Sequence, residues 1–481
     1  MEFSKWSFIL DDFILNDKET VKKLKDKLFF DNKNILLLRN EEILDEVNKF
    51  AERYKKFIDK AKTEREVVRE ILRISEKVGF KKFDKSRRYV PGDKVYKVSR
   101  DKNIALAIIG EKGAENGFKL IVSHVDSPRL DLKPSPLYEK NELALFKTHY
   151  YGGIKKYQWT AIPLALHGRI VLKKGSELDL IIGENEDEPC FCVTDLLPHL
   201  AHDQMNKSMN KAINGEDLNI LVGGIPFKSD KGSELVKLNI LNILNKKYKI
   251  TEHDFVFAEF EMVPAFKARD VGFDSNFIGA YGHDDRCCAF PAMYAMFETI
   301  VQPSTSVAFF VDKEEIGSEG NTGMKSTFLK HFLADLAEIS GVKNRQVLSK
   351  SKCVSADVNA AFDPNYSENF DPLNSSYVNK GVVLSKYTGF AGKAGASDAS
   401  AEFLSYMRMV FETDDITWQV GELGKVDNGG GGTIAKYVAN LDIDTVDVGI
   451  PVLSMHSPFE VISKLDLFEL FRALGAFLAT Y

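Results

Sequence analysis

The sequence lacks the features of disulfide-bonded, membrane-spanning and nucleic-acid-binding proteins. Its five cysteines are an odd number without a CxxC pair, which argues against a disulfide framework and a thiolate zinc finger. No apolar run is long enough to cross a bilayer, and residues 1–17 carry acids inside their apolar stretch, unlike a secretory signal. The net charge is -6, and lysines and glutamates are mixed rather than gathered into basic blocks. These absences predict a cytoplasmic protein that binds neither nucleic acid nor membrane.

The sequence also lacks a nucleotide-binding loop. Two segments are rich in glycine, KVDNGGGGTIA and FAGKAGASDAS. Neither contains the GK[ST] of a phosphate loop, and neither has a GxGxxG motif between a predicted strand and a predicted helix. Nucleotide chemistry is therefore disfavoured.

The apolar pattern that is present predicts a layered α/β domain with an insertion. A chain of 481 residues, 44% of them hydrophobic, can form one large core and a smaller one. Helical spacing over 43–58, a capping box at Thr63 and Glu66, and helical segments near the carboxyl end alternate with buried strands. The predicted strands are IALAIIG, FKLIVSHVD and SVAFFVDKEE. From about Pro134 to Ile250, short strand-like runs end in the helix-like SELVKLNILNILNKK, which predicts an inserted second domain.

A histidine and an aspartate follow a predicted strand in the motif SHVDSP. His124 and Asp126 are two residues apart, so they project to the same face, at an edge where α/β sheets commonly open into a crevice. The histidine could bind a metal while Asp126 holds its far ring nitrogen, which selects the tautomer and raises the basicity of the ligand. A hydrogen bond at a strand end is the alternative explanation.

Two acidic motifs occur later in the chain. In GHDDR, either of Asp284 and Asp285 could bridge two cations about 3.5 to 4 Å apart, because a carboxylate has two oxygens. A helix N-cap is the alternative. In VDKEEIGSEG, Glu315 could bind a metal while Glu314 stands free as a general base. A solvated acidic turn is the alternative for this pair.

Two further segments supply Asp357, in SADVN, and His456, in PVLSMHSPFE. With the earlier motifs they make two histidines and three carboxylates at the carboxyl ends of separate predicted strands, with one more glutamate beside them. Such ligands suit zinc, cobalt or manganese, and three per metal with a shared bridge leave room for a water molecule. The combination predicts a two-metal hydrolytic site.

Over nearly the whole chain, the sequence resembles the aspartyl aminopeptidase and aminopeptidase I family of two-zinc exopeptidases. The motifs that carry the resemblance are, in order, SHVDSP, YYGGIKKYQW, GHDD, EEIGS, SADVN and MHSPFE. The resemblance implies a three-layer α/β catalytic domain over 1–132 and 253–481. It also implies a β-rich dimerisation domain inserted over 133–252.

The resemblance also implies a role for each site residue. Asp284 would bridge both zinc ions, and Asp126 would orient the first histidine ligand. Glu314 would take a proton from the metal-bridging water, and the resulting hydroxide would attack the N-terminal peptide bond of a substrate with a free N-terminus. The remaining ligands would be His124 and Asp357 for one zinc, and Glu315 and His456 for the other.

Two further residues are implied to lie near the substrate. Members of the family assemble as tetrahedral dodecamers, in which a histidine of the inserted domain reaches the active site of a neighbouring subunit. The segment PHLAHD makes His199 the candidate, and a packing histidine on a loop is the alternative. In VLSKYTG, Lys386 resembles a lysine that faces the substrate, and a solvated surface lysine is the alternative.

The segment that follows Asp357 in SADVN departs from the family pattern. Family members specific for acidic residues carry histidines here, whereas this chain has Asn359, Ala360 and Asp363. An acidic substrate side chain in a partly dry pocket needs a cationic or hydrogen-bonding partner. We therefore expect neutral or basic N-terminal residues to be cleaved faster than Asp or Glu.

Two other functions fit parts of the pattern. A carboxypeptidase or amide-cleaving deacylase could use the same catalytic domain, but it would need a cation to hold a substrate carboxylate. A scaffold that kept the fold and lost activity is the other alternative, although every metal position and Glu314 are present. Metal content, together with hydrolysis of free and N-acetylated peptides, separates the three.

Overall fold

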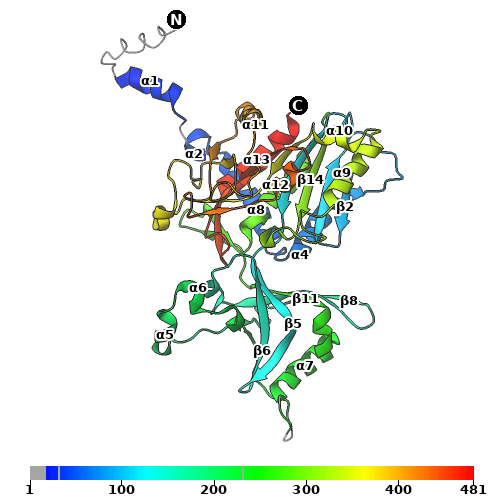
Figure 1. Cartoon of the computed structure of the whole chain (residues 1–481), viewed down its shortest axis with the longest axis vertical. Helices are drawn as coiled ribbons and strands as arrows, with labels where there is room; N and C mark the ends of the chain where they lie inside the picture. The colour runs from blue at the N-terminus through cyan, green and yellow to red at the C-terminus, as the bar shows by residue number, and fades with distance from the viewer. Residues whose placement is uncertain (1–17, 31–32, 230–231, 481) are drawn as a thin grey trace.

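The computed structural model describes residues 18–30, 33–229 and 232–480. The described chain forms a larger and a smaller lobe, which are joined through the strands that enter and leave the smaller one (Figure 1). The expectation about a secretory signal concerns residues 1–17, which lie outside the described residues. No described helix is both long and apolar enough to cross a membrane. All five cysteines are unpaired.

A nine-stranded sheet forms the centre of the larger lobe. Four neighbouring strands in its middle, β14, β4, β15 and β21, run parallel, and antiparallel strands flank them. The parallel strands are buried on both faces, as their near-continuous apolar sequence predicts. In order across the sheet, the strands are β1 (Lys81–Lys82), β2 (Lys94–Ser99), β3 (Asn103–Ile108), β14 (Thr305–Val311), β4 (Phe118–His124), β15 (Lys352–Ser355), β21 (Asp444–Gly449), β17 (Val382–Ser385) and β19 (Trp418–Val420).

Helices cover both faces of this sheet, which makes three layers. Alternate residues of β4 enter different cores: Ile121 packs with one set of helices, and Leu120 and Val122 pack with the other. This division follows from the two-residue period of a strand. One face is covered by α3 (Ile43–Ile58), α4 (Glu64–Lys77), α8 (His283–Glu298), α11 (Ala401–Thr413) and α13 (Lys464–Ala479), and the other by α9 (Phe328–Ile339), α10 (Asn344–Leu348) and α12 (Ala435–Ala439).

Several elements that the sequence predicts are confirmed. The helix over 43–58 has the predicted bounds, and Thr63 and Glu66 form the predicted capping box at the start of α4. The capping box satisfies backbone donors that would otherwise have no partner at the end of the helix. The predicted strands appear as β3, β4 and β14, and the helical segments near the carboxyl end appear as α11 and α13.

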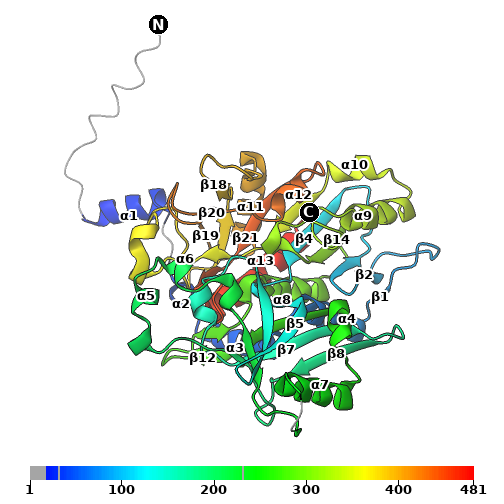
Figure 2. The same cartoon turned by 60° about the horizontal axis from the view of Figure 1, so that its bottom comes forward.

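A seven-stranded sheet and a helix form the smaller lobe, which comes forward in Figure 2. The helix α7 (Leu235–Tyr248) matches the helix-like segment at the end of the predicted insertion, and it packs on β5, β6 and β10. The sheet spans 129–264, so it begins four residues before the predicted bounds 133–252 and ends twelve residues after them. Its strands, in order, are β8 (Glu177–Ile182), β7 (Leu164–Val171), β11 (Ala258–Pro264), β5 (Arg129–Lys140), β6 (Leu143–Tyr151), β10 (Ile220–Gly223) and β9 (Cys192–Val193).

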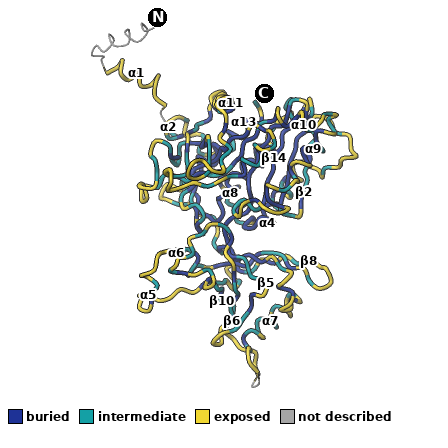
Figure 3. The backbone as a smooth tube through the Cα atoms, in the orientation of Figure 1, coloured by how far each residue is buried: buried dark blue, intermediate teal, exposed yellow. Residues whose placement is uncertain are grey.

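Two smaller sheets and several short helices complete the described chain. Figure 3 shows that burial concentrates around the large sheet, whereas the loop region with α5 and α6 in the smaller lobe is mostly exposed. The five-stranded sheet contains β12 (Arg269–Val271), β13 (Phe277–Ala280), β23 (Glu460–Ser463), β22 (Pro451–Leu453) and β16 (Asn359–Ala360), and the two-stranded sheet contains β18 (Gly389–Phe390) and β20 (Gly430–Gly431). The remaining helices are α1 (Lys18–Leu28), α2 (Ile35–Leu38), α5 (His202–Met205) and α6 (Met209–Ala212).

Candidate metal centre

The carboxyl ends of the parallel strands bring distant motifs together at one edge of the large sheet. Strand β4 ends at His124, Asp357 lies two residues after β15, and the turn with Glu314 and Glu315 follows β14. These strands are neighbours and run in the same direction, so their ends meet although the motifs are far apart in the chain. Asp284 lies in the first turn of α8, which packs against β4 and β14.

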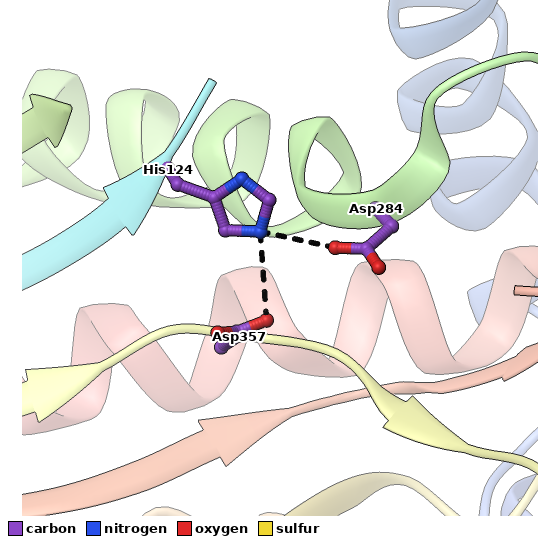
Figure 4. A group of neighbouring side chains, drawn as sticks. All are labelled: His124, Asp284 and Asp357. Atoms are coloured by element: carbon purple, nitrogen blue, oxygen red, sulfur yellow. Dashed lines mark hydrogen bonds and ion pairs between the residues drawn. The ribbon is translucent and has the colours of Figure 1, made fainter. Parts of the chain in front are cut away.

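One histidine and two aspartates form the first group that could hold a metal (Figure 4). The Nε2 atom of His124 lies 3.0 Å from Oδ1 of Asp284 and 3.8 Å from Oδ1 of Asp357. All three side chains are at least nine-tenths buried. Burial of a carboxylate is costly unless a cation or a hydrogen-bond donor compensates it, so two carboxylates around one imidazole indicate a cation site.

A second group shares one aspartate with the first. The Nε2 atom of His456 lies 3.1 Å from Oδ2 of Asp284 and 3.3 Å from Oε1 of Glu315. One oxygen of Asp284 therefore faces each histidine, which is the arrangement of a carboxylate that bridges two ions. Burial opposes ionisation of Asp284, but hydrogen bonds from both histidines lower its pKa below the usual value, so it is held as a carboxylate.

Asp126 is fully buried behind the first histidine and contacts both sides of the centre. Its Oδ1 lies 3.3 Å from Nδ1 of His124 and accepts a hydrogen bond from the Glu314 N–H at 3.1 Å. Its Oδ2 accepts hydrogen bonds from the Tyr151 hydroxyl at 2.8 Å and from the Glu315 N–H at 3.1 Å. The same carboxylate thus holds the histidine ring and the backbone of the glutamate turn.

The structure adds a carboxylate that the sequence motifs did not single out. Glu460 is buried, and its two oxygens accept hydrogen bonds from the backbone N–H of His456 at 2.7 Å and of Asp284 at 3.1 Å. It therefore fixes two residues of the second group relative to each other. Burial raises the pKa of Glu460 to about 8. The sequence feature that could have identified Glu460 is its position as the last residue of the MHSPFE motif.

The structure also distinguishes the neighbouring residues of GHDD. Asp285 accepts hydrogen bonds from the Ser123 hydroxyl at 2.6 Å and from the backbone N–H of His124 at 3.3 Å, and it belongs to neither group. His283 is buried between the Tyr54 hydroxyl and the carbonyl of Ile278, so it too lies outside both groups. Burial lowers the pKa of His283 to about 3 and keeps it neutral.

Glu314 lies beside the two groups without belonging to either. It begins a short 3₁₀ turn, Glu314–Ile316, directly after the left-handed residue Lys313. This backbone conformation turns the chain away from the end of β14 toward the site. Burial raises the pKa of Glu314 to about 7. A carboxyl group with a pKa near neutrality can accept and return a proton at neutral pH.

The two residues expected near the substrate lie outside the two groups. His199 is exposed in a 3₁₀ turn, Pro198–Leu200, in the loop region of the smaller lobe. Lys386 directly follows β17, is half exposed and forms an ion pair with Asp398 at 2.8 Å. The ammonium group of Lys386 is therefore already paired with a carboxylate of the same chain.

The segment that departs from the family pattern lies next to the same edge of the sheet. Asn359 is buried, and its amide donates to the Ser385 hydroxyl at 3.1 Å. Asp363 caps a short turn by accepting a hydrogen bond from the N–H of Asn365 at 2.9 Å. The carboxylate of Asp363 thus takes part in a local turn.

Comparison with known proteins shows which family this chain belongs to. A family model described as "Aminopeptidase I zinc metalloprotease (M18)" matches residues 57–478. The chain belongs to the M18 family. It is therefore a zinc aminopeptidase, a hydrolase, as the motifs predict, and the fold is the α/β catalytic domain with a β-rich second domain that the resemblance implies.

Relatives of high similarity span nearly the whole chain. A probable M18 family aminopeptidase 1 from Clostridium acetobutylicum is 46% identical over 443 residues, which are 90% of this chain and 95% of that protein. The crystal structure of an M18 aminopeptidase from Thermotoga maritima is 43% identical with a TM-score of 0.89, and the match covers 94% of this chain and all of that one. The S. cerevisiae mApe1 dodecamer, at 22% identity and a TM-score of 0.72, shares the fold.

Proposed function

We propose that this M18 enzyme binds two zinc ions per subunit, bridged by Asp284. His124 and Asp357 would complete one site, and Glu315 and His456 the other. Three nitrogen and oxygen ligands per ion, with one position left for water, suit catalytic zinc, and cobalt or manganese could substitute. The buried Oε1 of Glu315 supports the fit, because it has no hydrogen-bond donor among the described residues. The single observation that carries the proposal is the two-sided contact of Asp284 with both histidines.

The side chains around this centre divide the work of N-terminal peptide hydrolysis. When bound, the zinc ions would polarise the scissile carbonyl and make the attacking water more acidic. Glu314 would accept the proton of that water and deliver it to the leaving amine, since it lies beside both groups and its pKa is near neutrality. Asp126 would keep Nδ1 of His124 as the donor, through its backbone carbonyl at 3.1 Å and its carboxylate at 3.3 Å, so that Nε2 is free to bind a metal.

We also propose that the enzyme works as a homo-oligomer, a dodecamer like that of its yeast structural neighbour. The exposed loop region of the smaller lobe supports this, because it carries several large apolar side chains around His199 that a monomer would leave in water. These are Leu196, Leu197, Leu200, Met205 and Met209. We place the inserted dimerisation domain at 133–252 and the catalytic domain at 1–132 and 253–481, and His199 would reach the active site of a neighbouring subunit.

For substrate preference, we propose neutral or basic N-terminal residues. The support is the absence of histidines in the segment from Asn359 to Asp363, together with the engagement of Lys386 by Asp398. A lysine already paired with a carboxylate offers less charge to an acidic substrate than a free one.

The proposed function is tested by combining metal analysis with peptide hydrolysis. The purified enzyme should contain two zinc ions per subunit and release the first residue of a free peptide, but not of the same peptide with an acetylated N-terminus. Glu314→Gln should keep both metals and lose about 100- to 10,000-fold in kcat, since an amide cannot accept a proton from water. Activity within a few-fold of wild type in this variant would contradict the assignment of the base.

A further inference from the structure

Two lysines lie side by side at the opposite edge of the large sheet from the metal groups. Lys119 near the start of β4 and Lys352 at the start of β15 are directly paired in the register of these parallel strands. Lys119 precedes His124 by five residues, so the two edges are about 16 Å apart at about 3.3 Å per residue. Like charges on paired positions repel each other, and a sheet would ordinarily avoid them.

The described residues that line the cavity beside these lysines provide donors and cations but no acid. An exposed acid, Asp444 on β21, pairs in register with Lys352 from the other neighbouring strand and does not line the cavity. Together they line a cavity of about 590 Å³ with Lys350 and Tyr406, and no lining residue among the described ones is Asp or Glu. Lys119 is only 8% exposed; its ammonium donates to the Tyr406 hydroxyl and lies 4.8 Å from the centre of the Phe477 ring. The Lys352 ammonium lies 5.3 Å from the centre of the Tyr406 ring.

Further polar groups converge on the same cavity. Asn116 lines it, and the amide nitrogen of this residue is buried without a hydrogen-bond acceptor among the described residues. Lys350 lines it from the loop before β15, with its ammonium donating to the carbonyl of Glu115 at 3.1 Å. A buried cation, a second cation beside it and an unused amide donor are the groups that bind an oxyanion such as phosphate.

We infer that this cavity is an anion site, separate from the metal centre, that takes a phosphate group held by Lys119 and Lys352. Phosphate would neutralise the paired ammonium groups and accept from the Asn116 amide. Burial, and then the proximity of Lys352, lower the pKa of Lys119 from 10.5 to about 7, so a bound anion would favour its charged form and raise that pKa. The volume leaves room for a small organic group attached to the phosphate.

The test measures inorganic phosphate binding to the metal-loaded enzyme by calorimetry and by the rise in Tm, with chloride at equal ionic strength as the control for salt effects. Lys119→Met and Lys352→Gln should each raise the Kd for phosphate by about tenfold or more, since each removes a charge-assisted contact. Lys330→Gln, at an exposed lysine on α9, should change nothing. Phosphate that binds only at the metals would give the same Kd and the same rise in Tm in wild type and in all these variants.

Stability separates a binding role from a purely structural one. The folded protein holds Lys119 at a lower pKa than the unfolded chain does, so its charge opposes folding at neutral pH, and this cost is complete below about pH 7. Lys119→Met should therefore match or exceed the Tm of the wild type without phosphate and lose the rise with phosphate. Equal Tm rises in wild type and both cavity variants would overturn the inference.

Proton uptake gives an independent readout. The titratable groups that face Lys119 are Lys352 on β15 and Tyr406 on α11, and burial raises the pKa of Tyr406 to about 12, so it stays neutral. Sulfate does not itself titrate near neutrality. Its affinity for the wild-type protein should fall as pH rises through 7, and its binding at pH 7 should cause the wild-type protein, but not Lys119→Met, to take up protons. A phosphomonoester that binds more tightly than phosphate would identify an organic phosphate as the ligand.

Dissociation of the oligomer by phosphate would instead show that the lysines face a second copy of the chain, and the inference would be wrong.

Discussion

The carboxylate of Asp126 offers the sharpest test of how the metal centre is held. It accepts three hydrogen bonds, from Tyr151, Glu314 and Glu315, and faces Nδ1 of His124. An asparagine has one oxygen in place of two, so Asp126→Asn can keep the interactions of only one oxygen and turns an NH₂ group toward the donors at the other. The substitution therefore acts on the histidine, on the glutamate turn, or on both.

The size of the effect follows from the number of hydrogen bonds that the asparagine cannot accept. A hydrogen bond to a charged group contributes about 1.5 to 3 kcal/mol, so the removal of two corresponds to about 3 to 6 kcal/mol. Part of this loss lowers the free energy of unfolding, and part lowers the activity of the site. Substitution of a residue that hydrogen-bonds to a metal ligand typically costs about 10- to 100-fold in metal affinity or activity. We therefore expect kcat or zinc affinity to fall by about 100-fold. Tyr151→Phe removes one of these hydrogen bonds and should cost about tenfold.

The assay compares kcat, KM and zinc affinity, the last by competition with a chelator, for wild type and variants of equal sedimentation at a temperature where each is folded. Asp131→Asn is the matched control, because Asp131 pairs with Arg129 at 2.8 Å in the same polar network but does not contact the histidine. It should leave kcat near the wild-type value. The reasoning would be refuted if Asp126→Asn kept both kcat and zinc affinity within threefold, or if Tyr151→Phe had the larger effect.

Three further predictions concern the metals, the assembly and the substrate. Asp284→Ala should lose both zinc ions, whereas Asp357→Ala should lose one; two ions per subunit in the first variant, by native mass spectrometry, would exclude the bridge. His199→Ala should lower activity while keeping zinc content and a particle far larger than a monomer, and an active monomer in sedimentation would contradict the assembly. In a panel of Leu, Lys, Asp and Glu substrates at one pH, kcat/KM should be higher for Leu and Lys; a preference of about tenfold for Asp or Glu, equivalent to about 1.4 kcal/mol, would reverse the proposed specificity.

Much of the fold could be predicted from the sequence because its signals are local. Apolar spacing and a capping box marked α3 and α4, and unbroken apolar runs marked β3, β4 and β14. The positions of the candidate ligands after predicted strands were also local observations. Parallel strands bring their carboxyl ends to one edge, so this placement was enough to predict that His124, Glu315 and Asp357 meet. Asp284, in the first turn of α8, and His456, after β22 of the five-stranded sheet, reach the same place only through packing.

Only the tertiary structure decided which neighbours each side chain has. The spacing of residues left Asp284 and Asp285 equivalent, and only the family resemblance favoured Asp284. The packing of α8 against β4 turns Asp284 toward both histidine rings and Asp285 toward the Ser123 hydroxyl. The role of Glu460 depends on the backbone N–H of Asp284, 176 residues away, and no local pattern predicts that contact.

The paired lysines show the same limit at the other edge of the sheet. Alternation along a strand predicts which face Lys119 occupies, but not that β15, more than two hundred residues later, lies next to β4 in the register that pairs Lys119 with Lys352. Strand neighbours and their register depend on how the whole chain packs. The sequence by itself therefore determined the elements and the chemical types at their ends, whereas the order of the strands determined which of those groups act together, because contacts between distant segments form only in the folded chain.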